Sequence, residues 1–493
     1  MKAPALWIIF TTALTIVLAV FLSPITALAV LIGILCFGVA LLRPLWILAG
    51  LALYFPLEPF VLKFVPDHLF VYARFFPEVL LYGVAGVAIV SVLASSRRTC
   101  TPLDLPFALF LVTMLASIVI NLLPPETALL GARQILRFPI VYFAAVYLHP
   151  SRTFMKRLTI ALLALALAEA GLGILQAIVG ERLDTLLFPS EGRFFGELTL
   201  APNAFRFWDP GSRVFATLGR YDRLATFLSF ALLLGAGILY EMRHLVHRFE
   251  LRALFLLGLP ALVLTYSRSG WFGFVLGFLL IGFLLKRDMR VRVALVTFLL
   301  FTSAYVLFSG VVVSRLIDVP RQGVAERFFE AFSLSRWQGE YYGLGRLFWI
   351  VNTPLHVVPA APLFGHGPGQ FGGGAVLALR NTRVYDMLGL PFGVGGTEGY
   401  IDNNWLSLWG ETGTLGLIFY LWMFAALGAL AARTWRGAHD PFARAMALGF
   451  MGIIVAMSIH AFLASFLETR TLAYHFWLYG GFVTVLGRKE GVL

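Results

Sequence analysis

The sequence predicts an all-α protein that crosses a membrane many times. Of its 493 residues, 59% are hydrophobic and only 13% are charged, whereas soluble domains average about 25% charged residues. The mean hydropathy is +0.85. Apolar runs recur along the whole chain, and most approach the roughly 20 residues that a helix needs to cross a bilayer. Packing these runs into a soluble core would require far more polar surface than the chain contains.

The apolar runs define 14 candidate spans, and because two or three are short enough to be broken or re-entrant, we expect 12–14 transmembrane helices. The first run is followed by Ala-Leu-Ala at 27–29 and mimics a signal peptide, but more spans follow at once, so we interpret it as part of the first transmembrane hairpin. The spans lie at 6–22, 25–42, 45–56, 77–94, 105–122, 136–149, 158–179, 224–240, 253–266, 270–285, 293–309, 405–431, 443–464 and 473–486.

Short basic loops predict how the chain is oriented. Loops rich in lysine and arginine stay in the cytoplasm, and five such loops are separated from one another by pairs of spans. We therefore expect these loops and both termini on the cytoplasmic side. The loops lie at 95–99, 151–157, 241–252, 286–292 and 433–436.

This topology leaves two long segments outside, 180–223 and 310–402, of which the second is the candidate for a partly helical extramembrane subdomain. The expected organisation has four parts. They are N-terminal transmembrane helices (1–157), central helices with the outer loop 180–223 (158–309), an extracytoplasmic loop subdomain (310–402) and C-terminal helices (403–493).

The formal net charge of +12 favours anionic partners. No basic segment looks like a nucleic-acid module, so we expect anionic lipids and anionic substrates, and no nucleic acid. The two cysteines, Cys36 and Cys100, form no disulfide framework or metal motif. The chain also lacks an Asp-x-Asp motif, and its outer carboxylates show no metal-ligand spacing. We therefore expect no metal site and no cofactor.

The two outer segments contain thirteen arginines and no lysine. The planar guanidinium group suits bidentate recognition of phosphate, so the pattern indicates an outer face that binds anions. The alternative is that many of these arginines are interfacial anchors or ion-pair partners of the loop carboxylates Glu326, Glu330, Glu340 and Asp386. The arginines are Arg182, Arg193, Arg206, Arg213, Arg220, Arg223, Arg315, Arg321, Arg327, Arg336, Arg346, Arg380 and Arg383.

Arg268 is a further arginine, and it stands between two strongly apolar stretches, 254–264 and 271–285. A charge near the bilayer centre would cost roughly 2.5–3.5 kcal/mol on insertion scales. The predicted topology instead places Arg268 at the outer end of a tight helical hairpin, where it can face an anionic group. The alternative is a snorkelling hairpin cap, with Ser267 and Ser269 satisfying the backbone of the turn.

Four blocks, in order, resemble the O-antigen ligase and O-antigen polymerase superfamily of bacterial glycan-assembly membrane enzymes. They are "SRVFATLGRYDRLATFL" (212–228), "TYSRSGW" (265–271), "GRLFWIV…APLFGHGPGQF" (345–371) and "DNNWLSLWGETGTLGLIFY" (402–420). The resemblance covers about 212–430, and the first 200 residues match only as generic spans. Two departures stand out: 220–223 replaces an Asn-Pro-Asn turn, and Asp402 stands where the ligases usually have a histidine. The second departure favours the polymerase branch.

The resemblance implies a GT-C-like, metal-independent glycosyltransferase of the bacterial inner membrane whose active site faces the periplasm. Its substrates would be glycans linked to undecaprenyl diphosphate, as both donor and acceptor. Membrane lipids, a chain-length regulator and other assembly proteins are further candidate partners. A polymerase would join lipid-linked repeat units, whereas a ligase would transfer glycan to lipid A core or to a protein. A flippase is the third reading, but repeated halves and charges distributed within the spans, which transporters show, are missing from the sequence.

Glycosyl transfer from a diphosphate needs cations at the leaving group and a base near the acceptor hydroxyl. For the diphosphate we predict Arg268 first, then Arg213 and Arg346 in the matching blocks, then Arg220 and Arg223. The candidate bases, in order, are Asp402, Glu398, Glu411 and His366.

Each candidate base has a structural alternative. Asp402 could be a helix N-cap, and Glu411 could be a buried partner of an arginine. His366 could be an exposed loop histidine, and for this residue we favour that alternative over a catalytic role. Glu468 and Arg470 are expected to form a local ion pair. Candidate glycan-binding residues are Trp349, Tyr400, Asn403 and Trp405, although aromatic residues at a membrane surface also form ordinary belts.

Overall fold

The computed structural model describes residues 24–94, 100–190, 193–195, 198–201, 212–242, 249–308, 313–316, 323–393 and 398–492. The predicted span 6–22, the predicted basic loop 95–99, and Arg206 and Arg321 lie outside these residues.

The N-terminal part is a series of helices that follow the predicted spans. The predicted short span 136–149 is part of a broken pair, α6 and α7, whose axes differ by 56°. Pro139 begins α7, which suits the first helical position because proline lacks a backbone N–H. The helices are α2 (Pro24–Leu42), α3 (Pro44–Leu62), α4 (Asp67–Ala94), α5 (Asp104–Ile120), α6 (Pro125–Leu136), α7 (Pro139–Tyr147) and α8 (Arg152–Val179).

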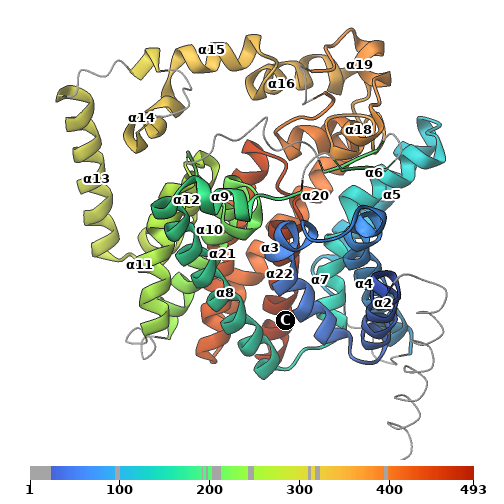
Figure 1. Cartoon of the computed structure of the whole chain (residues 1–493), viewed down its shortest axis with the longest axis horizontal. Helices are drawn as coiled ribbons and strands as arrows, with labels where there is room; N and C mark the ends of the chain where they lie inside the picture. Colours follow the sequence, from blue (N-terminus) through green and yellow to red (C-terminus); the bar gives the residue numbers. More distant parts are fainter. Residues whose placement is uncertain are drawn as a thin grey trace, which may run out of the picture.

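The central part is built around α10, whose residues 224–238 are all buried. By contrast, α13 stands at the edge of the bundle (Figure 1), and Val291 is its one buried residue, so its apolar side chains are free to face lipid. The elements are α9 (Glu181–Leu187), β1 (Arg193–Phe195), β2 (Leu198–Ala201), η2 (Ala216–Leu218), α10 (Tyr221–Glu241), α11 (Phe249–Leu264), α12 (Arg268–Leu279), η4 (Leu280–Leu285) and α13 (Met289–Phe308).

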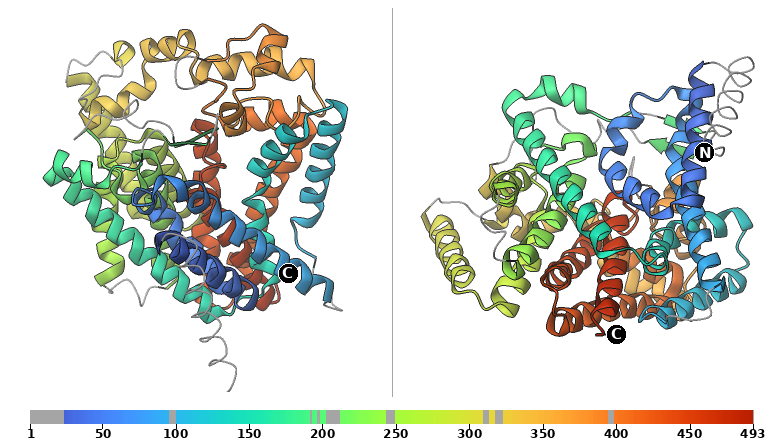
Figure 2. Two further views of the ribbon diagram at one scale, coloured as in Figure 1. Left: turned by 45° about the vertical axis from the view of Figure 1, so that its right-hand side comes forward. Right: turned by 90° about the horizontal axis from the view of Figure 1, so that it is seen from below.

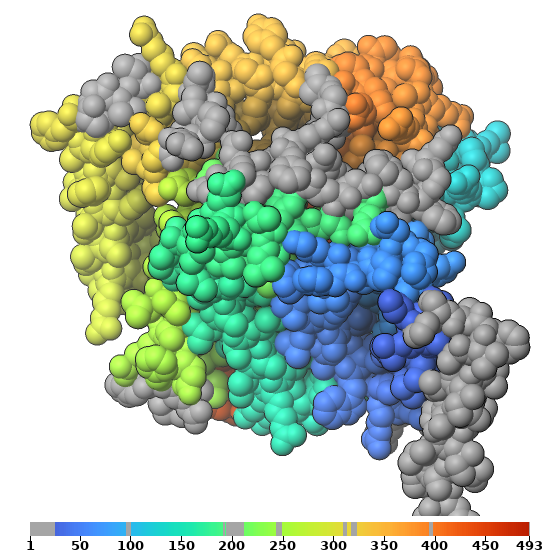
Figure 3. Space-filling model, viewed as in Figure 1, coloured from blue at the N-terminus to red at the C-terminus, as the bar shows by residue number. Residues whose placement is uncertain are grey.

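The segment after α13 forms a loop subdomain, residues 323–393, that covers one end of the bundle (Figures 1 and 2). Figure 3 shows it as a layer that crosses this end from the side of α13 to the side of α6. A cluster around Trp349, Phe371 and Tyr385 forms its own small core. The short elements are η5 (Val313–Arg315), α14 (Val324–Phe329), η6 (Glu330–Phe332), α15 (Leu334–Tyr342), α16 (Arg346–Asn352), η7 (Thr353–Val357), α17 (Val358–Ala360), α18 (Gly374–Leu379) and α19 (Arg383–Leu388).

Three long helices complete the chain: α20 (Asn404–Gly437), α21 (Pro441–Leu463) and α22 (Arg470–Lys489). Residues 471–487 of α22 are all buried, which makes it, with α10, the centre of the bundle. These two helices therefore contact protein on all sides, while the helices around them have faces left for lipid.

Among the described residues, nine helices are long and apolar enough to cross a membrane, or ten if the α6–α7 pair is one span. This number is below the 12–14 predicted because α5, α11 and α22, which coincide with predicted spans, do not meet the same criteria of length and apolarity. The two-stranded ribbon of β1 and β2 lies in the predicted outer loop 180–223. The prediction of an all-α polytopic membrane protein is confirmed.

The described basic loops 151–157, 286–292 and 433–436 lie at the end of the bundle opposite the loop subdomain (Figure 1). Arg152 forms ion pairs with Glu490 and, at 3.3 Å, with Asp440. The Lys489 ammonium donates to the carbonyl oxygen of Pro150 (2.7 Å). These contacts place the predicted loop 151–157, the α20–α21 turn and the C-terminus at one end, which we call the basic end.

Candidate active site

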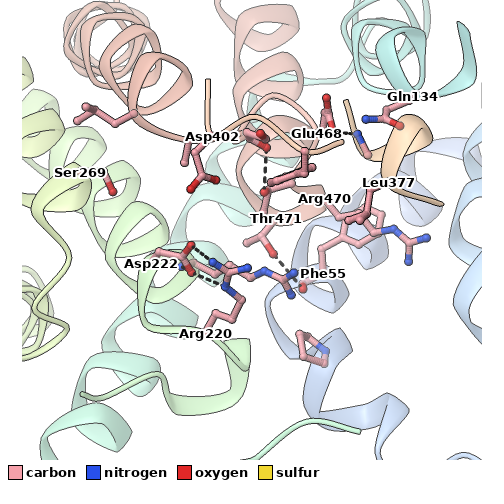
Figure 4. Close-up of a pocket in the computed structure, with 18 of the residues that line it drawn as sticks. Phe55, Gln134, Arg220, Asp222, Ser269, Leu377, Asp402, Glu468, Arg470 and Thr471 are labelled. Atoms are coloured by element: carbon pink, nitrogen blue, oxygen red, sulfur yellow. Dashed lines mark hydrogen bonds and ion pairs between the residues drawn. The ribbon is translucent and has the colours of Figure 1, made fainter. Parts of the chain in front are cut away.

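A cavity of about 530 Å³ lies between the loop subdomain and the helix ends beneath it. Among the residues that the structure describes, its wall includes nine arginines and four carboxylates, an excess of five positive charges, and we call it the arginine cavity. In the view of Figure 4, Ser269 and Gln134 lie on opposite sides, with Asp402 and Glu468 between them. The charged residues are Arg74, Arg133, Arg137, Arg220, Arg223, Arg268, Arg327, Arg346, Arg470, Glu58, Asp222, Asp402 and Glu468.

Four of the five predicted diphosphate ligands line this cavity: Arg268, Arg220, Arg223 and Arg346. Arg213 is not part of the wall. The guanidinium carbon of Arg213 lies 4.3 Å from the centre of the Tyr221 ring. Tyr221 lines the cavity, and Arg213 lies behind it. The tertiary structure therefore brings together residues from α10, α12 and α16 that are far apart in sequence.

Arg268 is the first residue of α12, and its neighbours cap the helix. Ser267 Oγ accepts a hydrogen bond from the backbone N–H of Gly270 (3.4 Å) and lies 3.1 Å from Ser269 Oγ. The predicted role of the serines in the turn is thus confirmed for Ser267, and the cap does not need the arginine. Arg268 instead reaches the loop subdomain, where Nη1 lies 2.8 Å from a carboxylate oxygen of Glu330.

Glu330 is fully buried and serves three arginines at once. Its carboxylate lies 3.0 Å from Arg327 and 2.7 Å from Arg336, in addition to Arg268, and Arg336 also pairs with Glu340. The predicted alternative, that loop arginines pair with loop carboxylates, is confirmed for Arg327 and Arg336. Because Arg268 and Arg327 both line the cavity, Glu330 fixes two of its cations in place.

A second group of arginines comes from helices that carry no motif. Glu78 of α4 accepts hydrogen bonds from Arg133 (2.5 and 2.8 Å), Arg137 (3.1 Å) and Arg470 (2.8 Å). Arg470 also pairs with Glu58 of α3. Glu58, Glu78, Arg133 and Arg137 were not predicted as site residues, although a glutamate within an apolar span, such as Glu78, indicates a buried partner. The predicted local pair of Arg470 with Glu468 is wrong, because Arg470 turns toward α3 and α4.

Asp402 lines the cavity with a half-exposed side chain, and its nearest cation is Arg346, with Nη2 at 3.9 Å. The helix that follows is capped by the next residue, since Asn403 Oδ1 accepts from the backbone N–H of Leu406 (3.0 Å). The predicted alternative, that Asp402 is the N-cap, is wrong. The Asp402 carboxylate is therefore available to the cavity.

Glu468 is a cavity carboxylate that has no ion pair among the described residues. It accepts hydrogen bonds from the backbone N–H of Gly374 (3.2 Å) and from the Asn404 amide (3.3 Å), while the Arg137 guanidinium donates to its backbone carbonyl oxygen (2.6 Å). Burial raises the pKa of Glu468 to about 7, and the neighbouring Arg137 and Gln134 offset only part of this shift. A carboxyl group with a pKa near neutrality is suited to proton transfer.

Glu411 and His366 lie outside the cavity wall and instead hold the segment 362–374, which we call the glycine-rich loop. Glu411 Oε1 accepts from the backbone N–H of Gly369 (2.8 Å), so its partner is a loop amide and the predicted arginine partner is wrong. The His366 ring is buried, with Nε2 3.0 Å from the carbonyl oxygen of Val357, and burial lowers its pKa. The exposed loop histidine that we favoured is also wrong. Glu398 is half-buried and does not line the cavity.

Of the four predicted glycan-binding residues, Tyr400 lines the cavity. Trp349 is buried against Phe371, with ring centres 5.8 Å apart. Asn403 is the buried cap of α20, and the Trp405 indole donates to the carbonyl oxygen of Ser458 (3.0 Å). These three residues are accounted for by packing and capping.

The glycine-rich loop fits into a kink of α20, where Gly413 has φ 68°. The kink leaves backbone groups of the helix unpaired, and the loop satisfies them. The N–H groups of His366 and Gly367 donate to the carbonyl oxygens of Gly410 (2.9 Å) and Glu411 (2.8 Å), and the Thr414 N–H donates to that of Pro362 (2.9 Å). Broken backbone at membrane depth is tolerated only where such partners exist.

We expect Gly413→Ala to lower the stability of the protein by about 3 kcal/mol or more. A Cβ at this position would collide with backbone atoms of Leu363 and Gly365, and the positive φ disfavours alanine as well. The measurement is thermal melting in detergent. The matched control is Gly428→Ala in the same helix, where a Cβ meets no atom within 4 Å, and which should leave the melting temperature unchanged or slightly raised. Equal melting temperatures of the two variants would contradict the tight packing of the glycine-rich loop against the kink of α20.

Among the described residues, no group of three or more His, Cys, Asp or Glu side chains could hold a metal ion. No curated protein matches the chain. Residues 253–421 match the family model described as O-antigen ligase. This range contains Arg268, Arg327, Arg346 and Asp402, whereas the cavity residues of α3, α4, α6, α10 and α22 lie outside it. This match supports the O-antigen ligase and polymerase superfamily for the chain.

Proposed function

We propose that the protein is a glycosyltransferase that polymerises oligosaccharide repeat units linked to undecaprenyl diphosphate. In this proposal it works at the outer face of a bacterial inner membrane, with the basic end and both termini in the cytoplasm. The O-antigen ligase domain supports a function of the ligase and polymerase type. The donor and the acceptor are both lipid-linked glycans, and a chain-length regulator or other assembly proteins are proposed partners.

The observation that carries the proposal is the excess of arginine in the cavity. The nine guanidinium groups and four carboxylates of its described wall create a positive potential at one end of a membrane bundle, where a lipid diphosphate would arrive. When the bond between the anomeric carbon and the diphosphate oxygen breaks, negative charge grows on the leaving group. Fixed guanidinium groups in a partly dehydrated cavity stabilise that charge.

The acceptor hydroxyl must lose a proton as its oxygen bonds to the anomeric carbon. We propose that a cavity carboxylate takes this proton, either Asp402 or Glu468. Asp222 and Glu58 are closely paired with Arg220 and Arg470, whereas the contact of Asp402 with Arg346 is long, at 3.9 Å. The products are then the extended glycan, free undecaprenyl diphosphate and a protonated carboxyl group, so atoms and charge balance. Tyr400 is the proposed contact for a sugar ring, because it alone of the predicted glycan-binding residues lines the described cavity.

The experiment is reconstitution of the purified protein with a defined undecaprenyl-diphosphate oligosaccharide. A ladder of longer glycans from this substrate alone supports the polymerase. Transfer that requires added lipid A core or an acceptor protein supports the second candidate, a ligase, which the description of the matching family favours. Passage of intact substrate across the bilayer without a new glycosidic bond would overturn both.

We further propose that transfer needs no divalent metal, because guanidinium groups already supply the positive charge that a metal would provide. Addition of EDTA to the reconstituted enzyme should therefore leave the ladder unchanged to within about twofold. A loss of product that Mg²⁺ or Mn²⁺ restores would contradict this expectation and would require a metal site beyond the arginine cavity.

A further inference from the structure

Arg74 and Arg223 differ from the other arginines of the cavity. Seven of the nine cavity arginines have a carboxylate oxygen within 4.0 Å. Within the part of the chain that the structure describes, the side chains of Arg74 and Arg223 have no hydrogen-bond or ion-pair partner. Arg74 belongs to the membrane helix α4 and Arg223 to the membrane helix α10, and both face the same cavity.

The two guanidinium groups repel each other. Arg74 interacts electrostatically with Arg223, Arg470 and Arg137, all of the same charge, and the one carboxylate that it faces, Glu58, is already paired with Arg470. Arg223 in turn faces Arg220 and the same Glu58, along with Asp222 and Tyr400. Ionisable residues in membrane helices are rare, and they normally mark a binding or transport site when they lack a partner. Arg74 and Arg223 line one cavity and have no ion pair within the described part of the chain, which indicates that an anion binds beside them.

We propose that Arg74 and Arg223 form the primary binding site for the diphosphate of the lipid-linked substrate, so that an N-terminal span completes the active site. This inference rests on the proposed function. A diphosphate ester offers oxygens to two planar guanidinium groups at once, and such bidentate pairs are the strongest charged hydrogen bonds in proteins. Arg268 already pairs with Glu330, so its proposed part is to stabilise the charge that grows on the diphosphate during transfer.

The same chemistry could come from the phosphate headgroup of a membrane lipid, so the test has two arms. Full-length wild type, Arg74→Gln and Arg223→Gln are titrated in neutral detergent with farnesyl diphosphate, and separately with phosphatidylglycerol. The matched control is Arg436→Gln, an exposed arginine at the basic end of α20. Each cavity variant should bind farnesyl diphosphate at least tenfold more weakly, a change of 1.4 kcal/mol, while the control binds like wild type.

Thermal melting separates binding from folding. Removing Arg74 relieves its repulsion by Arg470, Arg223 and Arg137, so the ligand-free Arg74→Gln protein should melt at the wild-type temperature or higher. It should also lose the stabilisation that farnesyl diphosphate gives to wild type. Arg74→Lys, which keeps the charge but loses the planar fork, should bind with intermediate affinity. A lower melting temperature with unchanged binding would make Arg74 a structural residue and would overturn the inference.

Two other results would also overturn it. If phosphatidylglycerol binds as tightly as farnesyl diphosphate and both variants lose both ligands, the pair is a headgroup site. If Arg74→Gln forms the glycan ladder at the wild-type rate, the inference fails while the proposed function stands. Conversely, intact diphosphate binding in a wild-type protein that forms no glycosidic bond would count against the proposed function and not against this site.

Discussion

Arg268→Ala is expected to slow glycan transfer by about 10²- to 10³-fold, the usual effect of removing one group that stabilises charge in a transition state. The residue lines the arginine cavity at the first turn of α12, and the cap of this helix is supplied by Ser267. Glu330 keeps its pairs with Arg327 and Arg336 when Arg268 is absent, so the loop subdomain should stay in place. The measurement is the initial rate of the reconstituted reaction.

Two companion variants show which property of Arg268 matters. Ser267→Ala removes the cap of α12 but leaves the charge, so it should lower the melting temperature and have little effect on transfer. Arg268→Lys keeps a cation beside Glu330 but loses the planar fork, and it should recover part of the rate. Near-normal transfer by a folded Arg268→Ala protein would return this residue to a purely structural role at the hairpin.

The rate of transfer is expected to rise about tenfold per pH unit up to about pH 7 and then to level off, if Glu468 is the base. Burial raises the pKa of Glu468 to about 7, so the carboxylate form that accepts a proton is scarce below this pH and dominant above it. Glu468→Gln should lose about 10²- to 10⁴-fold in rate and should also lose the inflection near pH 7. The pH–rate profile of wild type and variant is the measurement.

The same pKa has the opposite effect on stability. The pKa of Glu468 lies above the ordinary value of 4.5, so the folded protein holds a proton that the unfolded chain releases between these two values. Stability should therefore fall as the pH rises from about 4.5 to about 7. Glu468→Gln, which cannot ionise, should lose this part of the pH dependence. Its melting temperature at pH 8 should equal or exceed that of wild type.

Asp402→Asn decides between the two carboxylates. If Asp402 takes the proton, the rate of transfer by this variant should fall by about 10²- to 10⁴-fold, the usual contribution of general-base catalysis. Glu468→Gln should then keep most of its activity. Asn403 supplies the cap of α20 independently, so the Asp402 variant should fold normally. Full activity in both single variants would contradict a carboxylate base in this cavity.

Much of the fold could be predicted because a membrane span requires an uninterrupted apolar run, and such a run is visible in the sequence. The predicted spans 25–42, 224–240 and 443–464 correspond closely to α2, α10 and α21. The kink of α20 at Gly413 could not be predicted in this way, because glycine within an apolar run is also compatible with a straight helix. Only the backbone hydrogen bonds to the glycine-rich loop make the broken form stable.

The residues of the candidate site likewise fall into those that local motifs indicate and those that only helix packing brings to the cavity. Arg268, Arg346 and Asp402 could be found because they stand in local motifs. Arg133 and Arg470 could not, since their place in the cavity depends on how α6 and α22 pack against Glu78 of α4. Glu468 and Arg470 are only two residues apart, which predicts a local ion pair. The packing of α22 against α3 and α4 instead pairs Arg470 with Glu58 and Glu78.

The sequence by itself determined that the chain crosses a membrane repeatedly, that the segments 180–223 and 310–402 are rich in arginine and that Arg268 sits at a helix end. These properties follow from composition and from local patterns of a few residues. The tertiary structure alone decided which arginines are neutralised and which are not. Glu330 pairs with Arg268, whereas Arg74 and Arg223 are left facing one cavity. The physical reason is that electrostatic pairing depends on distance in space, and helices that are far apart in sequence supply the partners.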